Sequence, residues 1–200
     1  HKSNGLTNSG AAYIFEKEGG IWIQKQKLVP NDGGSHAYFG ISVDIDGDYA
    51  VVGAYQAKEN GIGTGAAYVF ERIGGIWLQV AKLIPDDAAA NDHFGWSLAV
   101  HQNKIIVSSE CDDDMGGNSG SAYIFQRNGA ILLQEAKLLA SDGAASDLFG
   151  TSVDIIGNSA IVGARFDDDM GANSGSAYIF EEEGGIWVQK AKLLASNGAS

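Results

Sequence analysis

The hexapeptide Gly120-Ser-Ala-Tyr-Ile-Phe125 decides the fold, because close copies of it recur along the 200-residue chain. The other copies stand at Gly10–Phe15, Gly65–Phe70 and Gly175–Phe180, so that each step is 55 residues (65 − 10 = 55). Other pairs keep the same step: Lys27-Leu28, Lys82-Leu83, Lys137-Leu138 and Lys192-Leu193; Phe39-Gly40, Phe94-Gly95 and Phe149-Gly150. No insertion or deletion interrupts this register, so the chain is an array of 55-residue units.

One unit contains four strand-like segments, which we call a, b, c and d. In the unit 94–148 we expect them near Gly95–Val100, Lys104–Ser109, Ser121–Arg127 and Ile131–Leu139. Short turns rich in Asn, Asp and Gly join a to b and c to d, and these residues tolerate the positive φ that tight hairpins require. The period of an amphipathic helix is absent, so the unit is predicted to be a four-stranded antiparallel sheet.

Strand d suggests how the units pack. Alternation predicts that Trp77, Gln79, Ala81 and Leu83 share one face of the sheet. The other face of this strand is apolar too, which indicates a sheet covered on both sides. Radially stacked blades provide such cover. We therefore predict an all-β fold, a β-propeller of four-stranded antiparallel blades, in which the recurrent Trp22, Trp77 and Trp187 mark packing positions.

The chain is predicted to form about three and a half blades of one propeller domain, since 200/55 is about 3.6. The expected boundaries are 1–38 for a half blade of strands c and d, then 39–93, 94–148 and 149–200 for the blades. Because a propeller closes with more blades than this, we expect the chain to be a piece of a longer one. A dimer in which two copies form one ring is a weaker alternative. Both copies would begin with the same half blade, so neither could complete the half blade of the other.

Composition excludes several partners. The formal net charge is −12 and 44% of residues are hydrophobic. Such an acidic surface repels phosphate backbones and anionic lipid, so neither nucleic acid nor membrane insertion is expected. The sequence has no apolar run of membrane-spanning length, and its single cysteine, Cys111, cannot form an internal disulfide.

The pattern Phe39-Gly40…Gly53-Ala54, repeated as Phe149-Gly150…Gly163-Ala164, resembles FG-GAP repeats. The middle copy keeps Phe94-Gly95. FG-GAP repeats form the propeller of integrin α-subunits and occur in many bacterial surface proteins. The resemblance implies an extracellular or cell-surface location. We expect each Phe to pack between blades, and each following Gly to allow a close backbone approach.

Integrin-type repeats often carry a calcium loop of spaced aspartates between strands a and b. In this sequence the corresponding segment is Asp44-Ile-Asp46-Gly-Asp48, and its aspartates do not persist in the later units. A two-residue hairpin cannot easily bring together the six or more oxygen ligands that Ca²⁺ takes. We expect the metal site of the family to be lost at this position.

The most distinctive polar feature is the acidic loop between strands b and c. Its candidate ligand residues are Asp112, Asp113, Asp114 and Asn118, and in the next unit Asp167, Asp168, Asp169 and Asn173. Clustered oxygen donors on a Gly-rich loop suit Ca²⁺, the one cofactor that the sequence suggests, or a hydroxyl-rich ligand. The same residues also stabilise turns. We favour the second interpretation, because the first such loop, Gln56–Asn60, lacks the aspartates.

Other polar and aromatic positions are expected to be structural. The recurrent Gln24, Gln79, Gln134 and Gln189 are predicted to form hydrogen bonds between blades. Trp96 is interpreted as a core variation rather than a sugar-stacking residue. The histidines share no metal-ligand spacing, and Cys111 is interpreted as a small apolar residue.

No catalytic set is visible: neither a base beside a nucleophile nor a phosphate loop occurs, so we do not expect an enzyme. The favoured function is an extracellular binding or adhesion module that recognises a protein or glycan through its rim loops. A structural scaffold that binds copies of itself is the alternative, and a hydrolase is less favoured.

Overall fold

The computed structural model describes residues 7–59, 62–129 and 131–196, and these contain β-strands but no helix. The half blade consists of β1 (Ala12–Glu18) and β2 (Ile21–Leu28). Blade 1 consists of β3 (Val43–Asp46), β4 (Tyr49–Ala54), β7 (Ala66–Ile73) and β8 (Ile76–Leu83), with β5 (Lys58–Glu59) and β6 (Ile62–Gly63) in its b–c loop. Blade 2 consists of β9 (Phe94–His101), β10 (Lys104–Ser109), β11 (Ser121–Asn128) and β12 (Ile131–Leu138). Blade 3 consists of β13 (Phe149–Ile156), β14 (Ser159–Ala164), β15 (Ser176–Glu183) and β16 (Ile186–Leu193).

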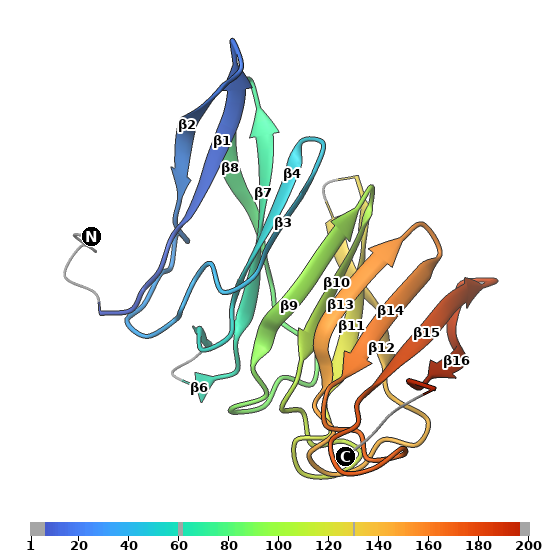
Figure 1. Ribbon diagram of the computed structural model, residues 1–200. Coiled ribbons are helices and arrows are strands. Elements are labelled where there is room, and N and C mark those ends of the chain that lie inside the picture. The colour runs from blue at the N-terminus through green and yellow to red at the C-terminus, as the bar shows by residue number, and fades with distance from the viewer. Residues whose placement is uncertain (1–6, 60–61, 130, 197–200) are drawn as a thin grey trace.

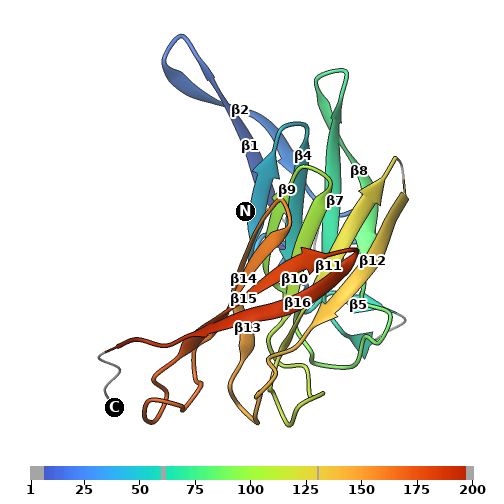
Figure 2. The same cartoon turned by 90° about the vertical axis from the view of Figure 1, so that its right-hand side faces the viewer.

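Each blade is an antiparallel meander in which neighbours in sequence are neighbours in the sheet, and the blades lie side by side as in a propeller (Figure 1). In Figure 1 the sheets follow one another in chain order, and in the side view blade 3 lies in front of the others (Figure 2). The predicted all-β fold of stacked four-stranded blades is confirmed. In the described part of the chain, no helix is long and apolar enough to cross a membrane.

Each blade has two distinct ends. Tight a–b and c–d hairpins close the upper end in Figure 1, which we call the hairpin end. The b–c loops and the d–a linkers all lie at the opposite end, which we call the loop end. Residue Ala130 of one predicted c–d turn, and residue Asn60 of the first b–c loop, lie outside the described residues.

The core consists of three clusters, one at each contact between neighbouring blades. We call the face of a blade that is turned to the preceding blade its front, and the opposite face its back. Between blades 1 and 2, Val51 and Val69 of the blade 1 back pack against Phe94, Val107 and Tyr123 of the blade 2 front. In blades 1 and 2, strands b and c are therefore covered on both faces.

The Phe-Gly pairs hold neighbouring blades together, as predicted. Phe94 is fully buried, and its N–H donates a hydrogen bond to the carbonyl of Thr64 in the preceding blade at 3.0 Å. Gly95 has φ +92°, and a Cβ there would lie 2.4 Å from the carbonyl oxygen of Ala66. The backbones approach too closely for any side chain at this position.

Three of the four recurrent glutamines bridge blades, as predicted, whereas Gln24 is exposed on the half blade and forms no such bond among the described residues. Gln79 Oε1 accepts a hydrogen bond from Asn31 N–H at 2.9 Å, and Gln134 accepts one from Asp86 N–H at 3.0 Å. Gln189 accepts one from Ser141 N–H at 2.9 Å. Each donor lies in the linker that leaves the preceding blade.

The predicted face of strand d is wrong, because every strand d contains a β-bulge. Phe70 pairs with Gln79 whereas Val69 pairs with Ala81, so Val80 is an extra residue in the strand. Beyond the bulge the alternation changes sides. Trp77 and Gln79 therefore face the preceding blade, whereas Leu83 packs on the opposite face with the next blade.

The second apolar set of strand d is not covered either. Ile76, Leu78 and Val80 are exposed, because this outermost strand diverges from the neighbouring blades. The recurrent tryptophans also differ: Trp77 is buried and Trp187 is partly buried, but Trp22 is 66% exposed because no described blade lies on the half-blade front.

Candidate functional site at the loop end

The two acidic b–c loops have the same internal structure. In blade 2, Asp112 Oδ1 accepts a hydrogen bond from Asp114 N–H at 3.1 Å, and the Asp112 carbonyl accepts one from Gly120 N–H at 2.9 Å. Asp113 Oδ1 accepts a hydrogen bond from Asn118 N–H at 2.7 Å, and Asn118 adopts φ +54°. In blade 3, the corresponding contacts join Asp167 to Asp169 and Gly175, and Asp168 to Asn173. The first two aspartates therefore shape the turn.

The first aspartate also belongs to a polar cluster that we call the lysine node. In blade 2, the Tyr123 hydroxyl lies 3.0 Å from Asp87 Oδ1 and 2.9 Å from Asp112 Oδ2. Lys137 Nζ lies 2.7 Å from Asp87, 3.0 Å from Asp112 and 2.6 Å from Asp114. Asp87 belongs to the linker after blade 1, so the node connects two blades.

Blade 3 repeats the lysine node residue for residue. Lys192 Nζ lies 2.8 Å from Asp142, 2.7 Å from Asp167 and 2.6 Å from Asp169. The Tyr178 hydroxyl lies between Asp142 and Asp167, at 3.0 Å and 2.9 Å. Tyr, Lys and the linker Asp all recur with the 55-residue step, so this node could have been predicted from the repeat.

The β-bulge makes the node geometrically feasible. Without the extra residue, Lys137 would lie on the face opposite to Gln134; with it, both point toward the preceding blade. Tyr123 pairs directly with Lys137 across the two strands, and the ammonium lies 5.2 Å from the centre of the aromatic ring. The β-bulge of strand d therefore turns Lys137 toward the preceding blade, where it forms a contact between blades.

The charges in the node stabilise one another. Partial burial would raise the pKa of Asp87, but the Lys137 ammonium and the Tyr123 hydroxyl hold this pKa below its usual value. The pKa of Asp167 is lowered too: burial opposes the shift, while Lys192, the Asp169 N–H and Tyr178 produce it. Burial would lower the pKa of Lys137, but the three carboxylates hold it above its ordinary value.

These contacts bear on the two interpretations of the acidic loops. Asp112 and Asp167 are buried and already face a lysine ammonium, so a structural role accounts for their position. Asp114 and Asp169 are about half exposed and reach the same ammonium group from outside. Ca²⁺ binding at these loops stays a prediction, and a cation would have to compete with Lys137 or Lys192.

The aspartates of the first a–b segment also have structural partners. Asp44 Oδ2 accepts a hydrogen bond from Val100 N–H at 2.8 Å, and Asp46 Oδ2 accepts one from Gln102 N–H at 2.6 Å. Both donors lie in or beside strand a of the next blade. These two carboxylates therefore connect blades 1 and 2.

A row of half-buried aromatic side chains crosses the loop end near the Phe-Gly pairs. The Tyr55 ring lies 5.3 Å from Tyr38, 5.0 Å from His93 and 5.2 Å from Trp96, measured between ring centres. The sequence interpretation of Trp96 as a core variation missed this row. Its members come from different strand ends and loops, so only the stacking of the blades brings them together.

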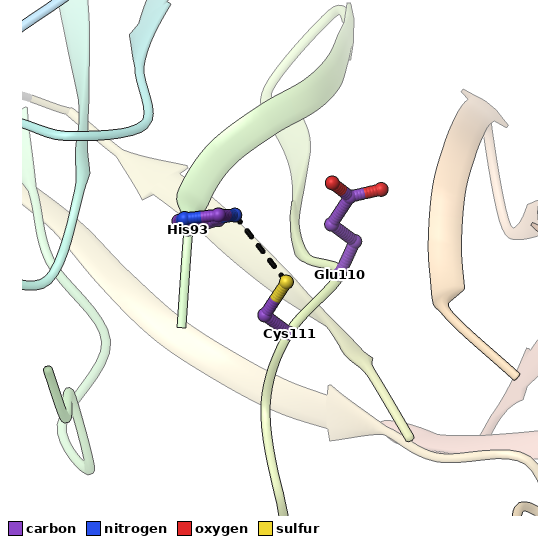
Figure 3. A group of neighbouring side chains, drawn as sticks. All are labelled: His93, Glu110 and Cys111. Atoms are coloured by element: carbon purple, nitrogen blue, oxygen red, sulfur yellow. Dashed lines mark hydrogen bonds between the residues drawn. The ribbon is translucent and has the colours of Figure 1, made fainter. Parts of the chain in front are cut away.

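Next to this row the fold brings three metal-ligand side chains together (Figure 3). Cys111 Sγ lies 3.3 Å from His93 Nδ1, and one donor atom of each of His93, Glu110 and Cys111 lies within 4.8 Å of the others. The interpretation of Cys111 as a small apolar residue did not anticipate these two neighbours. The histidine precedes strand a and the other two follow strand b, so no short sequence motif contains the three residues.

The surroundings disfavour the charged forms of Cys111 and His93. Burial, followed by the nearby Glu110 and Asp113 carboxylates, raises the pKa of Cys111 to about 11. Burial lowers the pKa of His93. A nucleophilic cysteine needs the opposite environment, one that stabilises the thiolate and the imidazolium. The Cys111–His93 pair therefore does not have the electrostatics of a catalytic dyad.

Comparison with protein families identifies the class of protein. The FG-GAP repeat model matches residues 22–70, 77–125 and 132–180, and the chain belongs to this family. Repeats of this family typically occur in extracellular or cell-surface, adhesion-related proteins, and the family is generally non-enzymatic. No curated protein matches the sequence.

Proposed function

We propose that the chain is an extracellular binding module that recognises a protein or glycan ligand through the loop end of its blades. The strands and the lysine nodes supply a constant framework, whereas residues at equivalent loop-end positions differ. For example, Tyr55 is replaced by Glu110 and Arg165 in the next two blades. A constant scaffold with a variable end is typical of a recognition surface.

The observation that carries this proposal is the aromatic row of Tyr38, Tyr55, His93 and Trp96. Partly exposed aromatic rings provide a large contact area with little loss of side-chain entropy on binding. Their flat faces suit sugar rings or apolar peptide side chains. Acidic loops beside them add hydrogen-bond acceptors for hydroxyl or amide groups.

The proposal can be tested on a glycan array and by pull-down from the extracellular fraction of the source, each with and without Ca²⁺. The variant Trp96→Thr introduces the residue found at the equivalent Thr151, so the blade should fold while ligand affinity falls at least about tenfold. Trp22→Ala is the matched control, because Trp22 is an exposed tryptophan outside the row. Absence of any ligand in both assays would contradict the proposal.

A further inference from the structure

The structure assigns a Zn²⁺ site to His93, Glu110 and Cys111 at the loop end of blade 2, with a fourth coordination position open to an exogenous ligand. This inference goes beyond the proposed recognition function and shares only His93 with the aromatic row. It rests on the donor set, on its spacing, on a buried carboxylate oxygen without a hydrogen bond and on the way the fold holds the three residues.

The donor set selects the metal. A thiolate, an imidazole and a carboxylate together suit borderline-soft Zn²⁺, whereas Ca²⁺ and Mg²⁺ take oxygen ligands. Three protein ligands with one open position is the arrangement of zinc sites that bind water or another small ligand. The thiol proton of Cys111 passes to solvent as the zinc–sulfur bond forms.

The spacing fits tetrahedral coordination. Bond lengths of about 2.3 Å to sulfur and about 2.0 Å to nitrogen or oxygen place neighbouring donors about 3.3–3.6 Å apart. The Cys111 Sγ to His93 Nδ1 distance of 3.3 Å falls within this range. All three donors lie within 4.8 Å of one another, and the Glu110 carboxylate, which is directed away from the Cys111 sulfur in Figure 3, would have to turn toward it to complete the set.

Glu110 provides the second observation that points to a cation. Its side chain is only 5% exposed, and among the described residues its Oε2 atom has no hydrogen-bond partner. The nearest cation is Arg165 Nη2 at 3.8 Å, too far for a hydrogen bond, and the Arg165 side chain is 44% exposed. A buried carboxylate oxygen that accepts no hydrogen bond is costly, and a bound cation would satisfy it.

The fold positions the ligands before any metal binds. His93 has φ +61°, and its counterparts Tyr38 and Leu148 share this conformation, so the turn belongs to the repeat rather than to the histidine. Cys111 N–H donates to the Asp92 carbonyl at 3.2 Å, which ties the cysteine to the residue before His93. The His93 ring also packs against Tyr55 and Trp96.

The same backbone arrangement in blade 3 carries no metal ligands. There Phe166 N–H donates to the Asp147 carbonyl at 3.2 Å, and the three positions are occupied by Leu148, Arg165 and Phe166. The blade therefore folds without His, Glu and Cys at these positions. Their coincidence in blade 2 is a property of that blade and not a requirement of the framework.

The test is titration of untagged, chelator-treated protein with Zn²⁺ by calorimetry and with Co²⁺ by absorbance. We expect one Zn²⁺ per chain, an increase in the unfolding temperature, and a thiolate-to-cobalt charge-transfer band that Zn²⁺ abolishes and excess Ca²⁺ does not. The absence of saturable Zn²⁺ binding, or Co²⁺ binding without a thiolate band, would overturn the site.

Variants borrowed from the other blades separate binding from folding. Cys111→Gln and His93→Leu introduce the residues found at Gln56 and Leu148, and each should weaken Zn²⁺ binding at least about a hundredfold while the circular dichroism spectrum is unchanged. Glu110→Gln should weaken it at least about tenfold. The control His101→Gln, outside the cluster, should bind like the parent protein. Stoichiometric binding that survives Cys111→Gln would also overturn the assignment.

Discussion

The lysine node between the half blade and blade 1 and the node between blades 1 and 2 have the same arrangement but different acidic partners. Between the half blade and blade 1, Lys82 lies 2.7 Å from Asp32 and 2.8 Å from Glu59. Between blades 1 and 2, Lys137 contacts Asp87, Asp112 and Asp114. Lysine and linker aspartate are constant, whereas the carboxylate from the b–c loop changes its position and number.

This difference teaches what the acidic loop adds. Asp32 and Glu59 are 47% and 42% exposed, so the first node resembles a surface ion pair. In the second node, Asp112 is only 5% exposed and shares its oxygens with Lys137 and Tyr123. The aspartates of blades 2 and 3 turn a solvated contact into a buried one, and this difference has measurable consequences.

The largest expected effect is that of removing the lysine from the buried node. Lys137→Met leaves Asp112 buried without a counter-charge, which should cost about 3 kcal/mol of unfolding free energy. Lys82→Met should cost about 1 kcal/mol, because its partners remain solvated. Urea denaturation of the two variants compares them directly, and equal losses would remove the distinction between the nodes.

The tyrosine hydroxyl should have the next largest effect. Tyr123→Phe removes a group that contacts both Asp87 and Asp112, and should destabilise the protein by about 1–2 kcal/mol. Tyr13→Phe is the matched control: this equivalent tyrosine in the half blade is 37% exposed, so its change should be close to zero. Thermal unfolding of both variants checks the difference.

The node should also make a smaller contribution to the pH dependence of the unfolding free energy. The pKa of Asp87 is lowered in the folded state, so its stabilising contribution is present above the unfolded pKa of about 4 and is lost as pH falls further. In Lys137→Met the cause of that lowering is absent, so the fall in unfolding free energy between about pH 5 and pH 3 should become shallower. Burial raises the pKa of Asp92, and Lys137 opposes this rise. Loss of the lysine therefore raises the pKa of Asp92 further, which also makes the fall in unfolding free energy shallower. An unchanged slope would contradict the assignment of the shift to Lys137.

The smallest effect is expected at the rim. Asp114 is 51% exposed and contributes the third, outer carboxylate to Lys137, so Asp114→Ala should cost less than about 1 kcal/mol. The loss should also shrink at high salt, because an exposed ion pair is screened. A loss as large as that of Lys137→Met would show that the outer carboxylate dominates the node.

The repeat predicted most of the architecture, because features with a 55-residue period report packing that every blade shares. The four strands, the buried Phe-Gly pairs and the glutamine bridges all follow from residues at equivalent positions. The bulge at Val80 was not predicted, because one extra residue leaves the hydrophobic pattern of a strand unchanged while it reverses the faces.

The site was less predictable, for two physical reasons. The acidic loops were correctly expected to stabilise turns, but their role in the node depends on where the bulge places Lys137. The His93–Glu110–Cys111 group and the aromatic row occur once, so periodicity cannot reveal them. They form from segments that are distant in the sequence and meet only in the folded blade, where the end of strand b lies beside the start of strand a.

A double-mutant cycle between Lys137 and Asp87 tests the central claim, that the lysine node couples one blade to the next. The two residues belong to blade 2 and to the linker after blade 1, and their charged atoms lie 2.7 Å apart. The unfolding free energies of Lys137→Met, Asp87→Ala and the double variant should give an interaction energy of about 1–2 kcal/mol. An interaction energy near zero would contradict the claim that this ion pair couples the two blades.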